Sequence, residues 1–366
     1  MKSMFFLLLC FVLIFQGCKK PEGPSDQNLF DTFDKKAMLS NLGNHVIEEY
    51  ENTLQACLVL ENSVKNFNQN VNISNLNQLK QDYNALLLQW KKAEMFNFGP
   101  QEEQFITQNI DYSVFNQNLY NQNLSNSQLD SAYFSQAGVT VKGLGCIEYM
   151  LFQQNDNETI SLFTTDNLAN KRKDYLLGCV KEIQYQLQKL IALWKPNGGN
   201  YLKTFVEKDG RDVSSSLTIY CNSLVYFIET VRRSKVGQPS GIENQGNINL
   251  NLLEKRISQN SISCILANLE GLENGFSGKN GKGIDDLLNH LKIEFNGVLL
   301  SQIIKNKFTE VKAKASAIPN LESAISNDFP KVQEFHVALK QLVVLLKVDM
   351  MSQLGLLITY TDNDGD

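Results

Sequence analysis

Histidine, proline and basic charge are all scarce in this sequence. The 366 residues include three histidines and seven prolines. Three histidines leave little room for a histidine-rich metal site. Few prolines, with apolar residues recurring at helical spacing, argue against a β-sandwich or barrel, which needs many turns. Asp and Glu outnumber Lys and Arg by 39 to 34, a formal net charge of −5. Because nucleic-acid binders need a basic surface to neutralise phosphates, we expect no nucleic-acid partner.

The rest of the composition is typical of a folded protein. Hydrophobic residues make up 43% of the chain and charged residues 20%, and this length can bury a sizeable core. At about 100 to 200 residues per domain, the length predicts two domains or one large one. The sequence contains neither a Gly-x-Ser-x-Gly nucleophile elbow nor a phosphate-binding loop. We therefore assign no catalytic residues from such motifs.

The first residues are typical of an export signal. A basic start precedes an apolar run over residues 4–15, followed by Gly17 and Cys18. The run is too short to span a bilayer as a stable helix. Gly17-Cys18 resembles a bacterial lipobox, although the two preceding residues differ from the usual aliphatic and small ones. We predict a lipoprotein signal peptide over residues 1–17, a lipidated Cys18 and a tether over 18–35. An ordinary cleaved signal with an incidental cysteine is the alternative.

Five further cysteines follow the apolar start and Cys18. They are Cys57, Cys146, Cys179, Cys221 and Cys264. Without a Cys-x-x-Cys pair, the sequence does not indicate a zinc cluster. Each cysteine has apolar neighbours in a helical pattern, so we expect buried free thiols. One disulfide remains an alternative in an oxidising compartment, with a pairing that the sequence does not define.

Apolar periodicity and turn residues predict a chain made of helices. The expected helices span residues 36–67, 74–96, 142–152, 166–194, 212–237, 261–276, 284–312 and 330–359. Ser74 and Asp212 are the expected N-caps of the second and fifth helices, and a break is expected near Leu291. We predict an all-α fold of two packed four-helix bundle domains, an N-terminal bundle over residues 36–200 and a C-terminal bundle over 201–366.

Glu148 is the first candidate for a functional side chain. It lies between an isoleucine and a tyrosine, so it projects near apolar surface. A carboxylate in such a place needs a partner, a metal ion or a raised pKa. From the residues alone, a solvated glutamate on the helix face is the simpler interpretation. Gly143 and Gly145 are unfavourable inside a helix, which suggests a close backbone approach there.

Several segments of the chain resemble motifs of the imelysin family in the same order. They are Trp90 with residues 96–100, then 109–111, 142–152, 235–241, 253–258, and 346–355 with 361–366. The resemblance covers nearly the whole chain after the signal. It implies a helical fold of two bundles, a bacterial periplasmic or outer-membrane location, and a link to iron uptake. The family has also been classed with the metallopeptidases.

The sequence departs from the family at its central motif, Gly-x-His-x-x-Glu. Gly143 and Glu148 match this motif, but Gly145 stands where the family has histidine. The Trp-Pro that usually follows the region of Asp111 is also replaced here, by Tyr112-Ser113-Val114. The resemblance therefore implies that Glu148 and Asp111 are candidates for ligand binding. It does not imply a complete metal site. Because glycine has no side chain to bind a metal, we expect no peptidase activity.

The resemblance implies an exported lipoprotein, anchored in a membrane through Cys18, at the periplasm or cell surface and most consistent with the outer membrane. In this interpretation it binds a metal, a chelate or a partner protein in the crevice between the bundles. Iron is the candidate cofactor, and an iron-uptake receptor is the candidate partner. The alternatives are a metallopeptidase or its inactive relic, or a non-catalytic helical scaffold.

The remaining histidines give little support to a separate metal site. His45 and Glu48 form a His-x-x-Glu pattern on one helix face. Two ligands fall short of the three that catalytic zinc usually takes from the protein, so we expect a plain solvated face. We expect His290 and His336 to be structural or surface residues.

The chain ends in an acidic segment that includes Asp362, Asp364 and Asp366. Their spacing resembles the start of a calcium loop, but the bidentate glutamate of such a loop is absent from this sequence. We expect a polar tail. A tail that folds back toward the crevice and lends carboxylates is the alternative.

The first prediction concerns Cys18. We expect Cys18→Ala to release the protein from the membrane fraction, because the substituted residue cannot carry a lipid. Membrane association is measured by fractionation and washing of the wild type and the variant. If Cys18→Ala leaves the protein as tightly membrane-associated as before, the lipid anchor is wrong.

Overall fold

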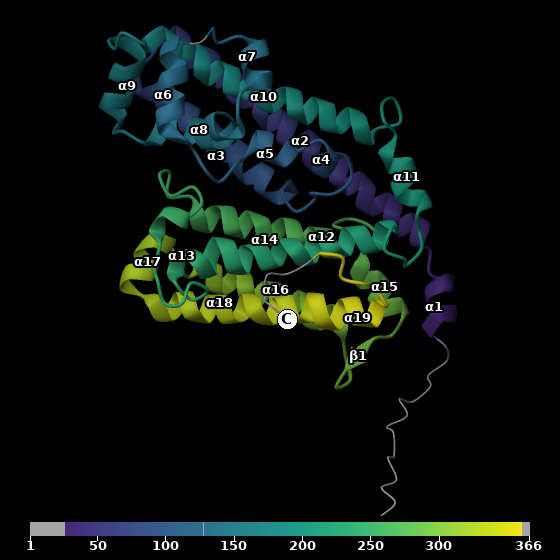
Figure 1. Cartoon of the computed structure of the whole chain (residues 1–366). Helices are drawn as coiled ribbons and strands as arrows, with labels where there is room; N and C mark the ends of the chain where they lie inside the picture. The colour runs from purple at the N-terminus through teal and green to yellow at the C-terminus, as the bar shows by residue number, and fades with distance from the viewer. Residues whose placement is uncertain (1–25, 127, 361–366) are drawn as a thin grey trace, which may run out of the picture.

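The computed structural model describes residues 26–126 and 128–360. In this part of the chain, the strands are the short antiparallel pair β1 (Glu294–Phe295) and β2 (Val298–Leu299), and the other regular elements are helices (Figure 1). The all-α prediction is therefore confirmed. No helix among the described residues is both long and apolar enough to span a bilayer. Cys18 and the acidic tail that begins after residue 360 lie outside the described residues.

The N-terminal half is organised by three long helices. They are α2 (Lys35–Gln69), α3 (Ile73–Ala93) and α10 (Ala169–Trp194), and α2 packs against both of the others. Short elements lie between α3 and α10: α4 (Pro100–Glu103), α5 (Ile106–Ile110), α6 (Gln117–Asn126), α7 (Ser131–Gln136), η1 (Val139–Val141), α8 (Gly143–Phe152) and α9 (Asp156–Thr164). Helix α8 contacts α3 and α10. The short helix α1 (Asp26–Thr32) precedes this half, and α11 (Tyr201–Glu207) follows it.

The C-terminal half has four main helical segments that contact one another in a ring. They are α12 (Ser216–Thr230) with the π-helix η2 (Val231–Gly237), α14 (Ser261–Ser277), α16 (Leu300–Ser316), and α18 (Phe329–Val344) with the π-helix η4 (Leu345–Met350) and α19 (Met351–Leu354). The connecting elements are α13 (Gln238–Ser240), η3 (Leu250–Leu252), α15 (Ile284–His290) and α17 (Leu321–Asn327). The exact division into two four-helix bundles stays a prediction.

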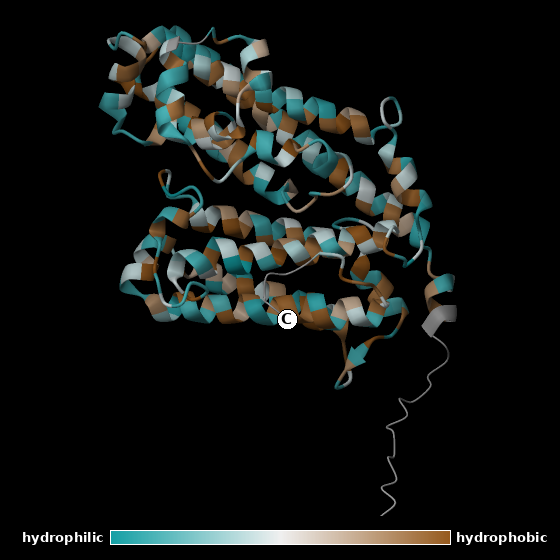
Figure 2. Ribbon diagram, viewed as in Figure 1, coloured by the Kyte–Doolittle hydropathy of each residue, from teal (hydrophilic) through white to brown (hydrophobic). Residues whose placement is uncertain are grey.

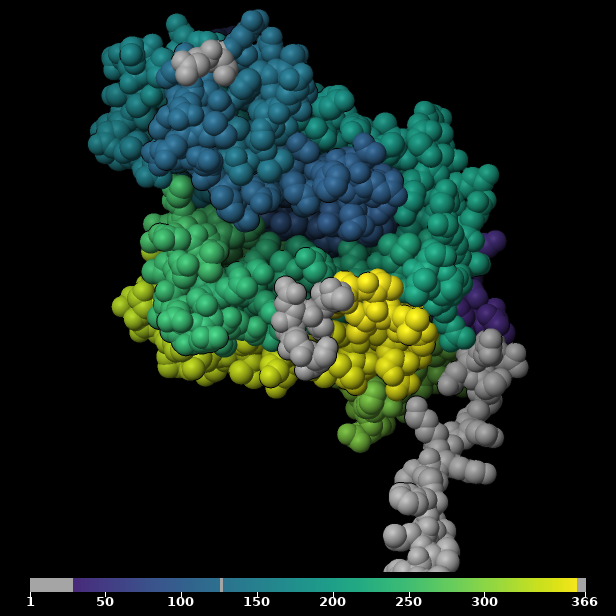
Figure 3. All heavy atoms as spheres, in the orientation of Figure 1, coloured from purple at the N-terminus to yellow at the C-terminus, as the bar shows by residue number. Residues whose placement is uncertain are grey.

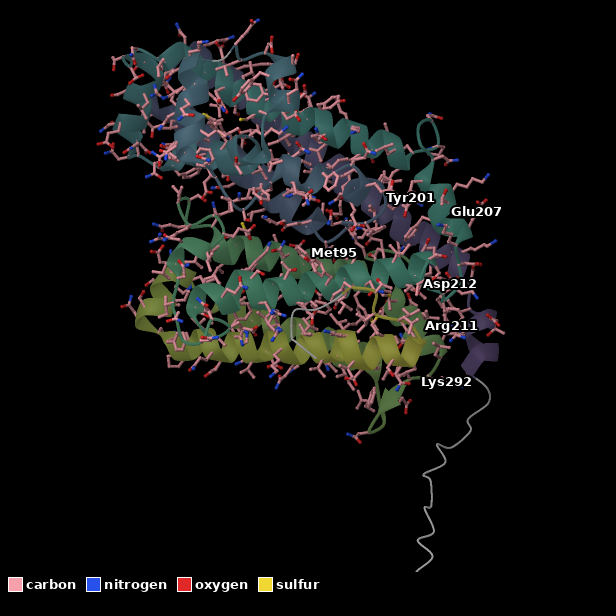
Figure 4. The ribbon with its side chains drawn as sticks, viewed as in Figure 1. Met95, Tyr201, Glu207, Arg211, Asp212 and Lys292 are labelled. Atoms are coloured by element: carbon pink, nitrogen blue, oxygen red, sulfur yellow. The ribbon has the colours of Figure 1, made fainter. Side chains whose placement is uncertain are left out.

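The two halves form two layers in Figure 1, with α2–α10 above and α12–α19 below, and α11 descends along one side. Figure 2 shows apolar and polar residues alternating along the long helices, as expected of amphipathic helices that bury one face. Figure 4 places Met95 between the layers. Its side chain is buried against Gly275 of α14, where an added Cβ would lie 2.8 Å from Met95 Cε. The five described cysteines are buried and free, as expected.

Several predicted helix ends are wrong for identifiable reasons. The N-cap of α3 is Asn72, whose side chain accepts from the Asn75 N–H, and Ser74 is already helical. Helix α12 begins after Ser215, while Asp212 accepts from the N–H and hydroxyl of Ser214 in the preceding turn. In both places, more than one residue able to cap lies in the same short segment.

The last predicted helix ends earlier than the apolar pattern suggested. It stops at Leu354, because Gly355 adopts a left-handed backbone with a φ of 66°. Leu357 is therefore 61% exposed and does not continue the buried stripe. The break expected near Leu291 is confirmed, since α15 ends at His290 and the β1–β2 hairpin precedes α16.

The backbones of the two halves approach each other closely at Gly271. It lies in α14, which packs against α3, and a Cβ built on it would lie 2.2 Å from the carbonyl oxygen of Lys92. A backbone carbonyl at that distance cannot move aside without shifting its helix. The absence of a side chain at residue 271 therefore sets how closely the layers pack.

The second prediction follows from this contact. We expect Gly271→Ala to lower the free energy of unfolding by about 1 to 3 kcal/mol, because the methyl group forces α14 away from α3. Chemical denaturation of both proteins measures the difference. The control is Gly138→Ala, where the Cβ would lie 3.9 Å from its nearest neighbour, Thr140 Oγ1. An equal effect of the two substitutions would contradict this account of the interface.

Candidate functional site

Charged residues from both halves meet at the seam between the layers, in a group that we call the central ion cluster. Its members are Lys91, Glu94, Asp111, Lys235, Glu254 and Lys255. The first three belong to the N-terminal half, where they lie at the end of α3, just after it, and just after α5. The last three come from η2 and the turn that follows η3. The three lysines balance the three carboxylates, so the cluster brings no net charge into the interface.

Lys91 lies at the centre of this cluster. Its side chain is fully buried, and its Nζ lies 3.0 Å from Glu94 Oε1 and 2.7 Å from Asp111 Oδ2. The same ammonium also donates to Glu254 from the other half. An ammonium group has three N–H donors, so each can serve a different carboxylate. The buried charge is thus fully hydrogen-bonded, which is the condition for its burial to be tolerated.

The other two lysines complete the network. Lys235 Nζ lies 2.9 Å from Glu94 Oε2 and 3.0 Å from Glu254 Oε2, and it donates to Asn268 Oδ1 at 2.8 Å. Lys255 Nζ lies 2.6 Å from Asp111 Oδ1. Each of the three carboxylates is therefore shared between two lysines. Removal of Lys91 or of Lys235 would leave more than one carboxylate without its full compensation.

The partners of Lys91, Asp111 and Glu254 favour the charged form of each of these three side chains. Burial alone would lower the pKa of Lys91, but Asp111, Glu254 and Glu94 outweigh it and hold this pKa well above its ordinary value. Burial would raise the pKa of Asp111, yet Lys255 and Lys91 bring it below the usual range. The pKa of Glu254 is lowered in the same way, against burial, by Lys235 and Lys91. Asp111 and Glu254 thus stabilise the fold at pH values above their pKa values in the unfolded chain. This contribution is lost as the pH falls through their lowered pKa values in the folded protein.

The backbone departs from regular geometry where the C-terminal half supplies its lysines. Lys235 lies in the π-helix η2, and π-helical turns are often found at functional sites. Lys255 has a left-handed backbone with a φ of 50°. Such a conformation costs of order 1 to 3 kcal/mol for a residue other than glycine. The ion pairs of both side chains help to offset this strain.

Glu148 is buried beside the cluster. This residue of α8 is 6% exposed, and its Oε1 accepts from the N–H of Ser258 at 2.9 Å and from the Ser258 hydroxyl at 2.7 Å. The interpretation of Glu148 as a solvated helix-face residue is therefore wrong. The turn over residues 254–259 brings the two predicted site residues together, because Lys255 binds Asp111 and Ser258 binds Glu148.

The two motif glycines play different parts. Gly143 begins α8 with a φ of 72°, and a Cβ there would lie 2.5 Å from the carbonyl oxygen of Ile110. The close approach expected from the sequence is thus present, and it packs α8 against the end of α5. At Gly145, a Cβ would lie 3.3 Å from the carbonyl oxygen of Tyr112. A Cβ at 145 would therefore make a tight contact, and the backbone carbonyl would have to give by a few tenths of an ångström.

Sequence reasoning missed most of the central ion cluster. Of the six members, it proposed only Asp111 as a site residue and did not propose Lys91, Glu94, Lys235, Glu254 or Lys255. A partial signal existed, because Lys235 and Glu254 lie inside segments that resemble family motifs and Lys91 follows Trp90. No such signal pointed to Asn268, which links the cluster to α14.

The three histidines lie outside the cluster. His290 Nε2 lies 3.1 Å from both Thr32 Oγ1 and the carbonyl oxygen of Leu29. His336 Nε2 lies 2.9 Å from Glu243 Oε1. Both therefore tie elements together, as expected for structural residues. His45 differs from the prediction, because it is 4% exposed and does not belong to a solvated face.

The spacing of three carboxylates in the cluster is compatible with a cation. Glu94, Asp111 and Glu254 each offer an oxygen, and these oxygens lie within 4.8 Å of one another. The cation that they surround in this structure is the ammonium of Lys91, whose side chain is fully buried. A metal ion would have to displace it. The residues present therefore do not fit a metal ion at this position.

Comparisons with known proteins agree with this architecture. The imelysin family model (peptidase family M75) matches residues 46–345. The crystal structure of an imelysin-like protein from Psychrobacter arcticum 273-4 has a TM-score of 0.72 and 18% identity, covering 89% of this chain and 97% of that one. A structure from Parabacteroides distasonis ATCC 8503, provisionally described as an iron-regulated protein A precursor, has a TM-score of 0.71 and 16% identity. It covers 87% of this chain and 95% of that one. No curated protein matches the chain.

The third prediction concerns the charge balance of the cluster. We expect Lys91→Met to lower the free energy of unfolding by about 3 to 5 kcal/mol, because it leaves buried carboxylates without their central cation. The carboxylates should then accept a metal ion, so Mn²⁺ should raise the melting temperature of this variant by more than it raises that of the wild type.

Lys92→Met is the matched control. Lys92 is the next residue along α3, is 27% exposed and pairs with the half-exposed Glu270. Loss of such a surface pair changes stability by about 1 kcal/mol or less. If Lys91→Met were no more destabilising than Lys92→Met, the central ion cluster would not have the structural role described.

Proposed function

Because this chain belongs to the imelysin family, we propose that it is a non-catalytic component of bacterial iron uptake. In this proposal, the central ion cluster fixes the arrangement of the two halves and does not itself hold the metal. The observation that carries the proposal is the position of Lys91. Its buried ammonium takes the place among Glu94, Asp111 and Glu254 that a metal ion would need.

The link to iron is supported by the provisional description of the Parabacteroides distasonis structure as an iron-regulated protein. We propose that this chain recognises an iron chelate or an iron-uptake receptor along the seam between its halves, which crosses the face seen in Figure 3. A neutral, fully paired cluster would give that surface a fixed shape. Glu148 and Asp111 would then contribute to recognition indirectly, by holding the turn over residues 254–259 in place.

The cellular location forms part of the same proposal. We propose an exported lipoprotein, anchored through Cys18 at the periplasmic or outer face of a membrane, with the outer membrane as the expected one. Export would bring the seam to the compartment where iron chelates and their receptors meet.

The second candidate function is a metallopeptidase, or a relic of one, and the peptidase designation of the family favours it. Against it stands Gly145, which offers no imidazole one helical turn before Glu148. Glu148 itself is engaged by the backbone and hydroxyl of Ser258. A catalytic zinc usually has three protein ligands and an open position, and this arrangement provides neither.

The fourth prediction tests the proposed function in cells. We expect a strain without this protein to grow more slowly than its parent when iron is limiting, and equally well when iron is abundant. Expression of the wild type should restore growth. Cys18→Ala should restore it poorly, because the binding surface is no longer held at the membrane.

Two results would contradict the proposal. One is unaltered growth of the deletion strain under iron limitation. The other is peptide cleavage by the purified protein that is sensitive to chelators and lost in Glu148→Ala, which would establish the metallopeptidase instead. Glu158→Ala serves as the control for the second measurement, because Glu158 lies on the exposed face of the neighbouring helix α9.

A further inference from the structure

A separate polar cavity lies between α2 and the loop that follows α14. Its volume is about 260 Å³, and His45, Glu48 and Asn44 of α2 line it opposite Lys279. Asn41 holds the loop in place, because its Nδ2 donates to the carbonyl oxygens of Gly278 at 2.8 Å and Lys282 at 3.0 Å. None of these residues belongs to the central ion cluster.

His45 is the unusual residue of this cavity. It is 4% exposed, and neither of its ring nitrogens forms a hydrogen bond with a described residue. Its ring packs edge-on against Phe96, with 5.7 Å between centroids. A buried imidazole without partners loses its hydrogen bonds to water and receives none in return, which is unfavourable. Burial lowers the pKa of His45, against the opposing effect of Glu49.

Two carboxylates lie next to this imidazole. His45 Nδ1 is 3.7 Å from Glu49 Oε1 and 3.9 Å from Glu48 Oε2. These distances are too long for hydrogen bonds. They are close to the spacing of two ligands on one metal ion, because bonds of about 2.1 Å place tetrahedral ligands about 3.4 Å apart.

Glu49 is positioned for such a role by a second contact. Its Oε2 accepts from Gln89 Nε2 at 2.7 Å, which leaves Oε1 directed toward His45 and Lys279. Hydrogen bonds of this kind orient carboxylates that bind metals. Glu48 has a side chain that is 49% exposed, so it can turn toward the same point at little cost.

Lys279 occupies the cation position in the present structure. Its Nζ lies 2.9 Å from Glu48 Oε1 and 3.3 Å from Glu49 Oε1. This lysine differs from Lys91 in one decisive respect, because its side chain is 28% exposed whereas that of Lys91 is fully buried. Because its side chain is partly exposed, Lys279 can move into solvent and give up its place.

We propose that His45, Glu48 and Glu49 bind a divalent transition-metal ion, with Zn²⁺ as the probe, and that the metal displaces the ammonium of Lys279. One imidazole and two carboxylates are ligands that first-row divalent metals accept. Three protein ligands beside a solvent-filled cavity leave a further position for water. The site is independent of the function proposed for the central ion cluster, and each proposal can fail without the other.

The test is calorimetric titration of the full-length chain, made without a histidine tag, with Zn²⁺. We expect one saturable site in the wild type. Glu48→Gln should weaken binding at least about tenfold, because a neutral amide replaces a charged ligand. Lys279→Ala should strengthen binding about tenfold, because the metal no longer competes with an ammonium. An increase in affinity on removal of a surface lysine is an outcome that a purely structural role for this cluster would not produce.

Glu51→Gln is the matched control, because Glu51 lies on the same helix, is 45% exposed and also pairs with a lysine, Lys195. It should leave the affinity unchanged. Imidazole nitrogen chemical shifts of ¹⁵N-labelled protein supply a second readout, in which the His45 signal should move on addition of Zn²⁺ while that of His290 does not. The proposal is overturned if neither the wild type nor Lys279→Ala binds Zn²⁺, or if Glu48→Gln binds it as tightly as the wild type.

Discussion

The burial of one lysine ammonium is the constraint on which the arrangement of this protein depends. Lys91 has no contact with solvent, so its charge is tolerated only while carboxylates from both halves surround it. Glu94 and Asp111 come from the same half as Lys91, but Glu254 comes from the other. Separation of the layers would therefore expose an incompletely compensated charge. Apolar packing across the seam drives the two halves together. The ion cluster then selects the arrangement of the halves in which every buried charge has its partners.

This constraint also explains the irregular backbone around the site. The lysines of the C-terminal half reach Glu94 and Asp111 across the seam, and both lie in irregular backbone. The π-helical turn at Lys235 and the left-handed Lys255 provide the required directions. Strain of this kind persists only where the surrounding contacts outweigh it. The turn over residues 254–259, which contains Lys255, also brings Ser258 to Glu148. The position of Glu148 therefore depends on the cluster, although Glu148 is not a member of it.

The fold was largely predictable from the sequence, because the spacing of apolar residues within a segment indicates a helix without knowledge of distant residues. Helix existence, the break near Leu291 and the burial of the five cysteines all follow from local patterns. Helix ends were less predictable, because neighbouring residues such as Asn72 and Ser74 compete to cap the same helix. The site was only partly predictable. Asp111 and Glu148 lie in recognisable segments, but their partners Lys255 and Ser258 are more than one hundred residues away in the chain.

Carboxylates surround a lysine at two places, Lys91 and Lys279. The comparison of the two shows that burial of the lysine, more than the number of carboxylates, separates a structural cluster from a binding site. Around Lys91, three carboxylates have a spacing that suits a metal ion, yet the ammonium among them is fully buried. Around Lys279, the carboxylates are fewer, but the lysine is partly exposed and a buried imidazole without partners stands beside it. A search for acidic residues would select the first group. The free energy of exchanging the ammonium for a metal ion favours the second, because the displaced ammonium of Lys279 can be solvated by water.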